Sequence, residues 1–149
     1  MSSAHWHLIT SHAPLFGIGF SLVLLAWGLL RRSADVQRAA LGLYVASALL
    51  VLPAYFTGQP ALGAVKGVPG YAPEVADRHA DVAALSLAAT LVAGGAAAAA
   101  MVVSRRGQGL SPLWVGAIAL TGLLAVASLA WASNLGGQIR HVEIRYTPQ

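Results

Sequence analysis

The sequence predicts an all-α protein, a four-transmembrane-helix antiparallel bundle. Hydrophobic residues make up 57% of the 149 residues, charged residues only 9%, and the mean hydropathy is +0.68, which is too apolar for a soluble domain of this size. Four long runs carry almost no charge, and a membrane-spanning helix needs about 20 such residues. We therefore expect one transmembrane domain covering 1–149, with spans at about 13–30, 39–56, 80–103 and 112–135.

Composition also excludes several classes of function. The chain has no cysteine, so neither a disulfide nor a thiolate metal site is possible. Its net charge of +4 is small, and the arginines stand beside the apolar runs. That placement is typical of topology signals and lipid headgroup contacts, not of nucleic-acid binding. The lipid bilayer is therefore the first expected partner.

The first two spans are read from uncharged runs. Pro14 to Leu30 has no charge and is closed by two arginines, Arg31 and Arg32. The second run ends near Pro53, where a kink or an end of the helix is expected. Residues 57–78 follow, with three prolines and four glycines, so we expect a long connection of turns or short helices there.

The third and fourth spans complete the bundle. The third is rich in alanine and glycine, which allows close helix contact inside lipid. On a helical wheel one narrow stripe of it is expected to face the bundle: His79, Ala83, Ser86, Thr90, Ala93 and Ala97. The fourth span begins at Pro112, where a first-turn proline is tolerated.

An even number of spans puts both termini and the second loop on one side of the membrane. All five histidines fall on that side: His5, His7, His12, His79 and His141. The two short loops opposite carry five arginines, against four cationic residues on the histidine side. The positive-inside bias therefore favours a bacterial inner (cytoplasmic) membrane protein with both termini in the periplasm.

Four groups of residues resemble a known family. They are His12-Ala-Pro14 entering the first span, Thr57-Gly58-Gln-Pro60-Ala61 after the second, His79 opening the third, and Gly136-Gly137-Gln-Ile-Arg140-His141 after the fourth. Over essentially its full length the chain resembles an uncharacterised family of bacterial four-helix integral membrane proteins. The resemblance implies the fold and little about activity. Similar proteins often have glutamate after the third-span histidine, whereas this chain has Ala80 there, with Asp77 and Asp81 nearby.

The histidines carry the functional hypothesis. Imidazole is the commonest metal ligand and an axial ligand of haem iron. His12, His79 and His141 stand at the same ends of three different spans, so a bundle would bring them to a similar depth. A bare Cu, Zn or Fe ion would take these three as ligands, with Asp81 or Glu143 supplying oxygen. A haem b would take two of them, and Arg140, Arg145, Arg78 or Lys66 would pair with its propionates.

Two alternatives remain open from the sequence. The leading one is a small redox-associated protein that binds haem b or a transition metal on its outer face and passes electrons. The other is a structural or accessory subunit without a cofactor, a homo-oligomer or part of a larger membrane complex, in which the histidines are interfacial side chains. Neither implies an enzyme. His5 and His7 could form a second, amino-terminal metal-binding pair, but on a mobile terminus we expect them to be solvated.

The stretch that follows the fourth span is compatible with two structures. Asn134, Gln138, His141 and Arg145 would lie on one stripe if the helix continued. The pair Gly136-Gly137 instead favours an end of the helix close to the membrane surface.

Overall fold

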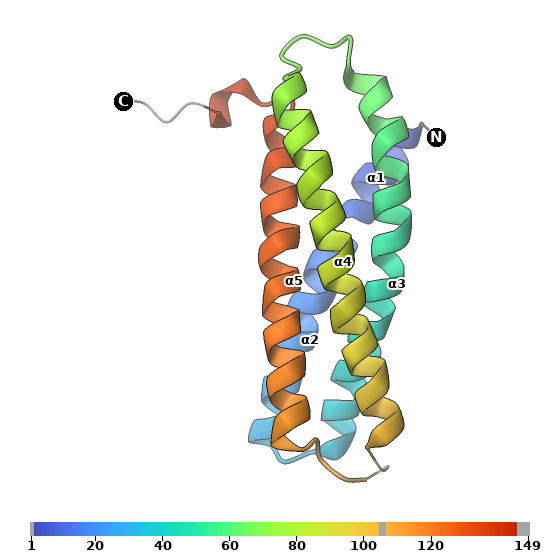
Figure 1. The fold of residues 1–149 in the computed structure, drawn as a ribbon, viewed down its shortest axis with the longest axis vertical. Coiled ribbons are helices and arrows are strands. Elements are labelled where there is room, and N and C mark those ends of the chain that lie inside the picture. Colours follow the sequence, from blue (N-terminus) through green and yellow to red (C-terminus); the bar gives the residue numbers. More distant parts are fainter. Residues whose placement is uncertain (1, 105–106, 146–149) are drawn as a thin grey trace.

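The computed structural model describes residues 2–104 and 107–145. Its helices are α1 (Ser3–Ser11), α2 (Ala13–Leu30), α3 (Ala34–Val65), α4 (Pro73–Val103), α5 (Pro112–Gln138) and the short 3-10 helix η1 (Val142–Ile144). Because α1 and α2 together form one segment, four long helical segments run alternately up and down (Figure 1). Each is long and apolar enough to cross a bilayer. The predicted all-helical, four-span bundle is confirmed.

The helices form a closed ring of neighbours. α2 packs against α3 and α5, α4 packs against the same two helices, and α1 packs mainly against α3. The start of α1, the α3–α4 connection and η1 lie at one end, which we call the histidine end (Figure 1). The α2–α3 turn, which holds Arg31 and Arg32, and the α4–α5 turn lie at the other, the arginine end. The common side for all histidines, expected from the even span number, follows from this arrangement.

The first span is broken at His12. Pro14 has no amide hydrogen, and its ring crowds the carbonyl of the preceding turn, so a regular helix cannot run through this point. α1 therefore ends at Ser11, and α2 begins anew at Ala13. No residue of α1 is fully buried, and α1 packs mainly against α3.

The connection between the second and third spans is shorter than the sequence predicts. α3 runs on through Pro53 and Pro60 to Val65, and α4 already begins at Pro73, so most of the expected turn region is helical. Both internal prolines are exposed on the outer face of α3, so their rings do not crowd the neighbouring helices. The remaining turn passes through Gly70, whose φ of +85° favours glycine.

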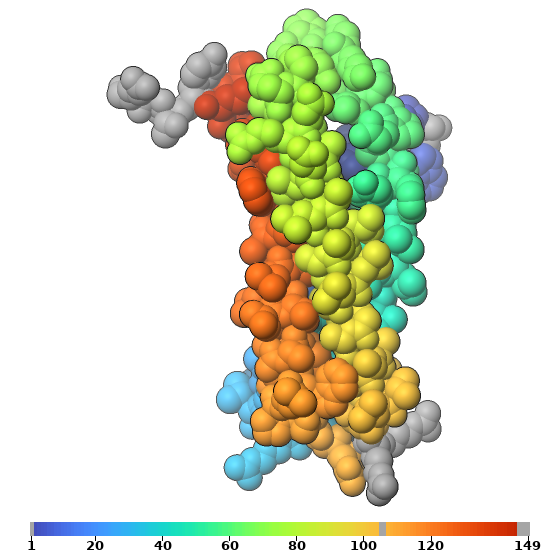
Figure 2. Space-filling view, viewed as in Figure 1, coloured from blue at the N-terminus to red at the C-terminus, as the bar shows by residue number. Residues whose placement is uncertain are grey.

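Small residues bring the helices into close contact. A Cβ atom on Gly94 would overlap with Ala48, one on Gly17 with Ser47, and one on Gly122 with the Tyr44 hydroxyl. In lipid there is no hydrophobic drive between helices, so such contacts are a main source of association. The α4 stripe expected from the sequence faces the interior, with His79 and Ala83 partly buried and the rest buried. Figure 2 shows α4 and α5 closed against each other along their length.

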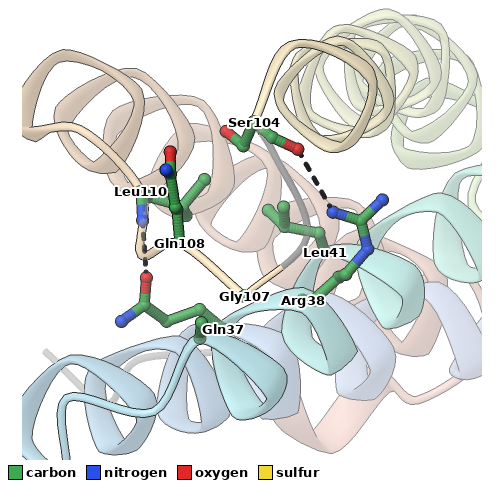
Figure 3. A pocket seen from close by; sticks show the side chains of 8 residues that line it. Gln37, Arg38, Leu41, Ser104, Gly107, Gln108 and Leu110 are labelled. Carbon is green, nitrogen blue, oxygen red and sulfur yellow. Dashed lines mark hydrogen bonds between the residues drawn. The ribbon is translucent and has the colours of Figure 1, made fainter.

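Gln37 and Arg38 of α3 fasten the arginine end. The Gln37 side-chain amide donates to the Gly28 carbonyl (3.2 Å), and its oxygen accepts from the Leu110 amide (2.8 Å). Arg38 donates to the carbonyls of Met101 (3.0 Å) and Ser104 (3.4 Å) at the end of α4. Figure 3 shows these two side chains around the α4–α5 turn. One turn of α3 therefore holds both loops of this end in place.

Candidate functional site

His7 is held at the interface of α1 and α3. Its Nδ1 lies 2.9 Å from the carbonyl oxygen of Ala54 and 3.3 Å from the Thr57 hydroxyl. A carbonyl oxygen can only accept, so we assign the ring hydrogen to Nδ1. In the neutral ring this leaves the lone pair on Nε2. His7 is half-buried, so the expectation that it is solvated on a mobile terminus is wrong.

His79 is held in the same way at the interface of α4 and α5. Its Nδ1 lies 2.8 Å from the carbonyl oxygen of Ala132, so its hydrogen is also assigned to Nδ1 and its lone pair to Nε2. The side chain is half-buried, about one turn before the apolar part of α4 begins. Metal-binding histidines commonly show this arrangement, in which one ring nitrogen donates to a carbonyl and the other is free to bind.

A glycine accompanies each of these histidines. Gly58 follows Ala54 by four residues, and a Cβ atom there would lie 3.5 Å from His7 Cε1. Gly136 follows Ala132 by four residues, and a Cβ atom there would lie 3.2 Å from His79 Cε1. We call each Ala-x-x-x-Gly segment a histidine socket, because the alanine carbonyl accepts from the ring and the glycine lies beside it. Only at Gly136 would an added Cβ atom be too close; at Gly58 it would make an ordinary contact. The two halves of the chain contain the same arrangement, in which a histidine near the start of one span contacts a socket near the end of the next span.

The two sockets bring their rings together. The centroids of His7 and His79 lie 6.4 Å apart, and the ring planes are nearly perpendicular, at 85°. We call these two residues the histidine pair. Its members come from helices that do not otherwise pack closely, since α1 lies mainly on α3, and α4 lies on α3 and α5. The site is therefore a meeting point of the two halves of the chain.

His12 lies at the same end but on the surface. It occupies the break between α1 and α2, with Nδ1 3.2 Å from the Ser11 hydroxyl and Nε2 3.4 Å from the Ser133 hydroxyl of α5. His12 and His79 thus contact consecutive residues of α5, Ser133 and Ala132. His12 is exposed, which places it at the rim of the site.

His141 lies away from the pair. α5 ends at Gln138, and His141 then adopts an extended conformation before η1, so it does not continue the helical stripe that one alternative placed it on. Its Nδ1 is 2.7 Å from Glu143 Oε1, and both side chains are about two-thirds exposed. The backbone amide of Glu143 itself, and then His141, lower the pKa of the Glu143 carboxyl. Arg140 is exposed beside them.

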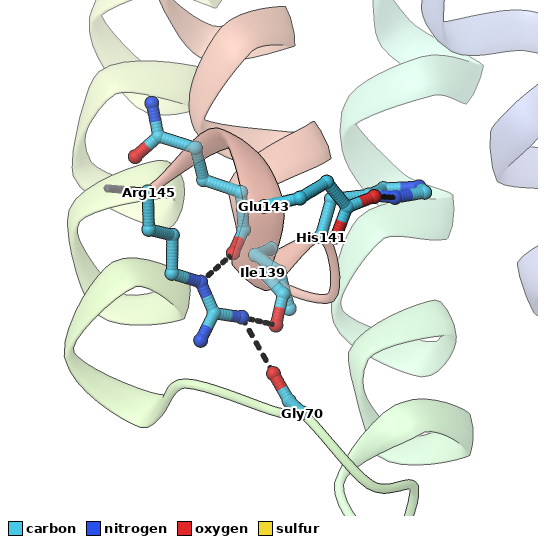
Figure 4. A network of polar contacts seen from close by, with 6 residues as sticks. Gly70, Ile139, His141, Glu143 and Arg145 are labelled. Atoms are coloured by element: carbon cyan, nitrogen blue, oxygen red, sulfur yellow. Dashed lines mark hydrogen bonds and ion pairs between the residues drawn. The ribbon is translucent and has the colours of Figure 1, made fainter. Parts of the chain in front are cut away.

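Arg145 donates its hydrogen bonds to backbone carbonyls. Its guanidinium donates to the carbonyls of Gln138 and Ile139 at the end of α5 and to that of Gly70 in the α3–α4 connection (Figure 4). The last carbonyls of a helix have no partner within it, and a cation satisfies them well. Arg145 thus fastens the chain end to the neighbouring loop, whereas the sequence placed it at a cofactor propionate.

The structure brings together a different set of ligands from the one expected. Asp81 is exposed on α4, and within residues 2–104 and 107–145 no three histidine, aspartate or glutamate side chains gather around one point. Of the three expected histidines, His79 lies in the pair, His12 at its rim and His141 apart. His7 was missed. The repeated Ala-x-x-x-Gly spacing at Ala54 and Ala132 is the sequence signal that could have found it.

Comparison with known proteins adds no assignment: no protein-family model, no curated protein and no solved structure matches this chain.

Proposed function

We propose that the protein is a small redox-associated membrane protein that binds haem b iron through Nε2 of His7 and His79. The observation that carries the proposal is the histidine pair itself. Two imidazoles from different helices lie close together, and the Nδ1–H of each is directed at a backbone carbonyl. Such a bond fixes the tautomer and raises the basicity of the binding nitrogen.

The number of donors favours haem over a bare ion. A haem would need only two donors from the protein, and His7 and His79 would supply them. A bare Zn, Cu or Fe ion held by protein alone usually takes three or four side chains, and in the described residues no such group exists. His7 and His79, whose ring centroids lie 6.4 Å apart, would be the two residues that hold the haem.

When bound, the haem supplies one-electron chemistry. This chain would hold the iron with two neutral nitrogen donors, and the histidine sockets would orient both rings. His12 would stand at the exposed edge of the site. Arg140, Arg78 and Lys66 are exposed at the same end and remain candidates from the sequence for a propionate partner. The contacts at Gly94, Gly17 and Gly122 fill the bundle further down, so we place the cofactor at the histidine end.

We propose a bacterial inner membrane location, with the histidine end on the periplasmic side. The two turns of the arginine end are short and hold four arginines, with Arg38 near the start of α3 as a fifth, and cytoplasmic loops carry such an excess. This orientation would place the cofactor where periplasmic redox partners can reach it.

A second candidate function is a cofactor-free accessory subunit. One observation favours it: each imidazole already joins two helices by a hydrogen bond, so the pair could serve the fold alone. Visible absorption of the purified protein separates the candidates. A Soret band selects haem, and stoichiometric metal without that band selects a bare ion. Neither signal, after incubation with haem and with metal, selects the accessory subunit.

A further inference from the structure

Ser133 of α5 makes a contact that the buried serines of the bundle do not make. Each buried serine donates to a carbonyl three or four residues earlier in its own helix: Ser21, Ser47, Ser86 and Ser128. The Ser133 hydroxyl instead lies 3.4 Å from Nε2 of His12, at the break between α1 and α2. A serine hydroxyl beside an imidazole of another segment is the arrangement from which serine nucleophiles are built.

The contacts of His12 assign its tautomer. The Ser11 hydroxyl donates to the Leu8 carbonyl (3.4 Å), so its oxygen accepts from Nδ1–H of His12 at 3.2 Å. We therefore place the ring hydrogen on Nδ1 and the lone pair on Nε2, which faces the Ser133 hydroxyl. A general base needs its lone pair on the nitrogen that contacts the nucleophile. Ser11 thus orients His12, as a carboxylate does in the common serine triads.

This contact lies at the boundary of the apolar part of the bundle. His12 directly precedes α2, whose 18 residues carry no charge, and Ser133 lies in the last turns of α5. The ester carbonyls of phospholipids stand at the same boundary, between the headgroups and the hydrocarbon core. His12 is exposed and Ser133 is partly exposed, so a lipid can reach both. Phe16 follows His12 by one helical turn and offers exposed apolar surface to an acyl chain.

We propose that Ser133 and His12 form a catalytic dyad that hydrolyses carboxylic esters of membrane lipids, independently of His7 and His79. His12 Nε2 takes the proton of Ser133 Oγ as this oxygen bonds to the ester carbonyl carbon. The ester bond then breaks, the alcohol leaves with the proton from His12, and the acyl group stays on Ser133. Water gives a proton to His12 and attacks the acyl carbon, the carboxylic acid leaves, and the proton returns to Ser133. The first amides of α2 adjoin His12 and lack partners within their helix, so they are the candidate donors to the oxyanion.

Labelling of the full chain in detergent with a fluorophosphonate, which reacts with activated serines, tests this proposal. Peptide mass spectrometry should find the label on Ser133, and Ser133→Ala, which removes a single oxygen atom, should abolish it. His12→Ala should slow labelling by about 10²- to 10⁴-fold, the contribution that a general base typically makes. Ser11→Ala should also slow it, and Ser11→Thr, which keeps the hydroxyl, should restore it. Hydrolysis of phosphatidylglycerol in mixed micelles should fall in the same variants.

Ser128→Ala is the matched control. It makes the same change in the same helix, at a serine that donates to its own helix, and should leave labelling unchanged. A wild type that takes no label, or a label that persists in Ser133→Ala, would overturn the proposal. Hydrolysis of p-nitrophenyl butyrate without hydrolysis of phosphatidylglycerol would overturn it as well, because the substrate would then be a soluble ester.

Discussion

The rings of His7 and His79 lie 6.4 Å apart, although 72 positions separate the two residues along the chain. Each ring is directed by a hydrogen bond to a carbonyl of the following span, that of Ala54 or Ala132. The pair therefore depends on four helices at once. Changes in the sockets should alter the pair as strongly as changes in the histidines themselves.

The first prediction concerns the sockets. Gly136→Ala places a Cβ atom 3.2 Å from His79 Cε1, so the ring must shift by a few tenths of an ångström beside the Ala132 carbonyl. Groups that orient a binding histidine typically change metal affinity by about 10- to 100-fold, and we expect the lower part of that range in a haem titration. Gly137→Ala is the neighbouring control, since its Cβ atom would make only an ordinary contact with Ile144 at 3.5 Å. Equal affinities of the two variants would show that the socket does not position His79.

The second prediction concerns helix packing. Gly94→Ala should destabilise the bundle, because its Cβ atom would overlap with Ala48, whereas a Cβ atom on Gly95 has no neighbour within 4 Å. Both changes raise helix propensity equally, so their difference isolates the overlap, at about 1–3 kcal/mol. Reversible unfolding of both variants in detergent micelles measures it. Equal stability of the two proteins would mean that α3 and α4 do not meet at Gly94.

The third prediction concerns topology. The chain has no cysteine, so a single introduced one reports its own side of the membrane. Ala64→Cys, at the histidine end, should react with an impermeant thiol reagent added outside intact cells. Gln108→Cys, at the arginine end, should react only after lysis. Gln108 is a better site than Gly107, whose φ of +80° would strain a cysteine. The reverse pattern would invert the proposed orientation, and labelling of both from outside would contradict the opposed ends.

The fourth prediction concerns pH and the chain end. The pKa of Glu143 is lowered below its ordinary value of 4.5, first by its own backbone amide and then by His141. The ionised carboxylate therefore stabilises η1 at pH values above 4.5, and this contribution is lost as the pH falls through the lowered pKa. Chemical shifts of the η1 amides should move at that low pH in the wild type. In Glu143→Gln this step should be absent, and its persistence there would assign it to another group.

The fold was predictable because composition and span length are strong signals. Uncharged runs of this length have no alternative to a helix in lipid, and the small residues of the third span marked its buried face. The ends of the helices were less predictable. Pro60 is compatible with a helix when its side chain and its missing bond face outward, and the sequence does not show which way it faces.

The site was only partly predictable for a related reason. His79 lies on the predicted inner stripe, but His7 lies in α1, which ends at Ser11 before the break at His12 and packs against α3. His141 lies apart because the helix ends three residues before it. In each case the side chain's position follows from a local irregularity, and helical periodicity cannot carry a prediction across such a point.

The most direct test of the account is a haem titration of the full chain in detergent, followed by the Soret absorption. The wild type should bind one haem, and His7→Ala and His79→Ala should each lose most of the binding because one axial ligand is gone. His5→Ala and His141→Ala should bind as the wild type does, since both side chains are exposed away from the pair. A wild type that binds no haem, or His7 and His79 variants that bind it unchanged, would contradict the account.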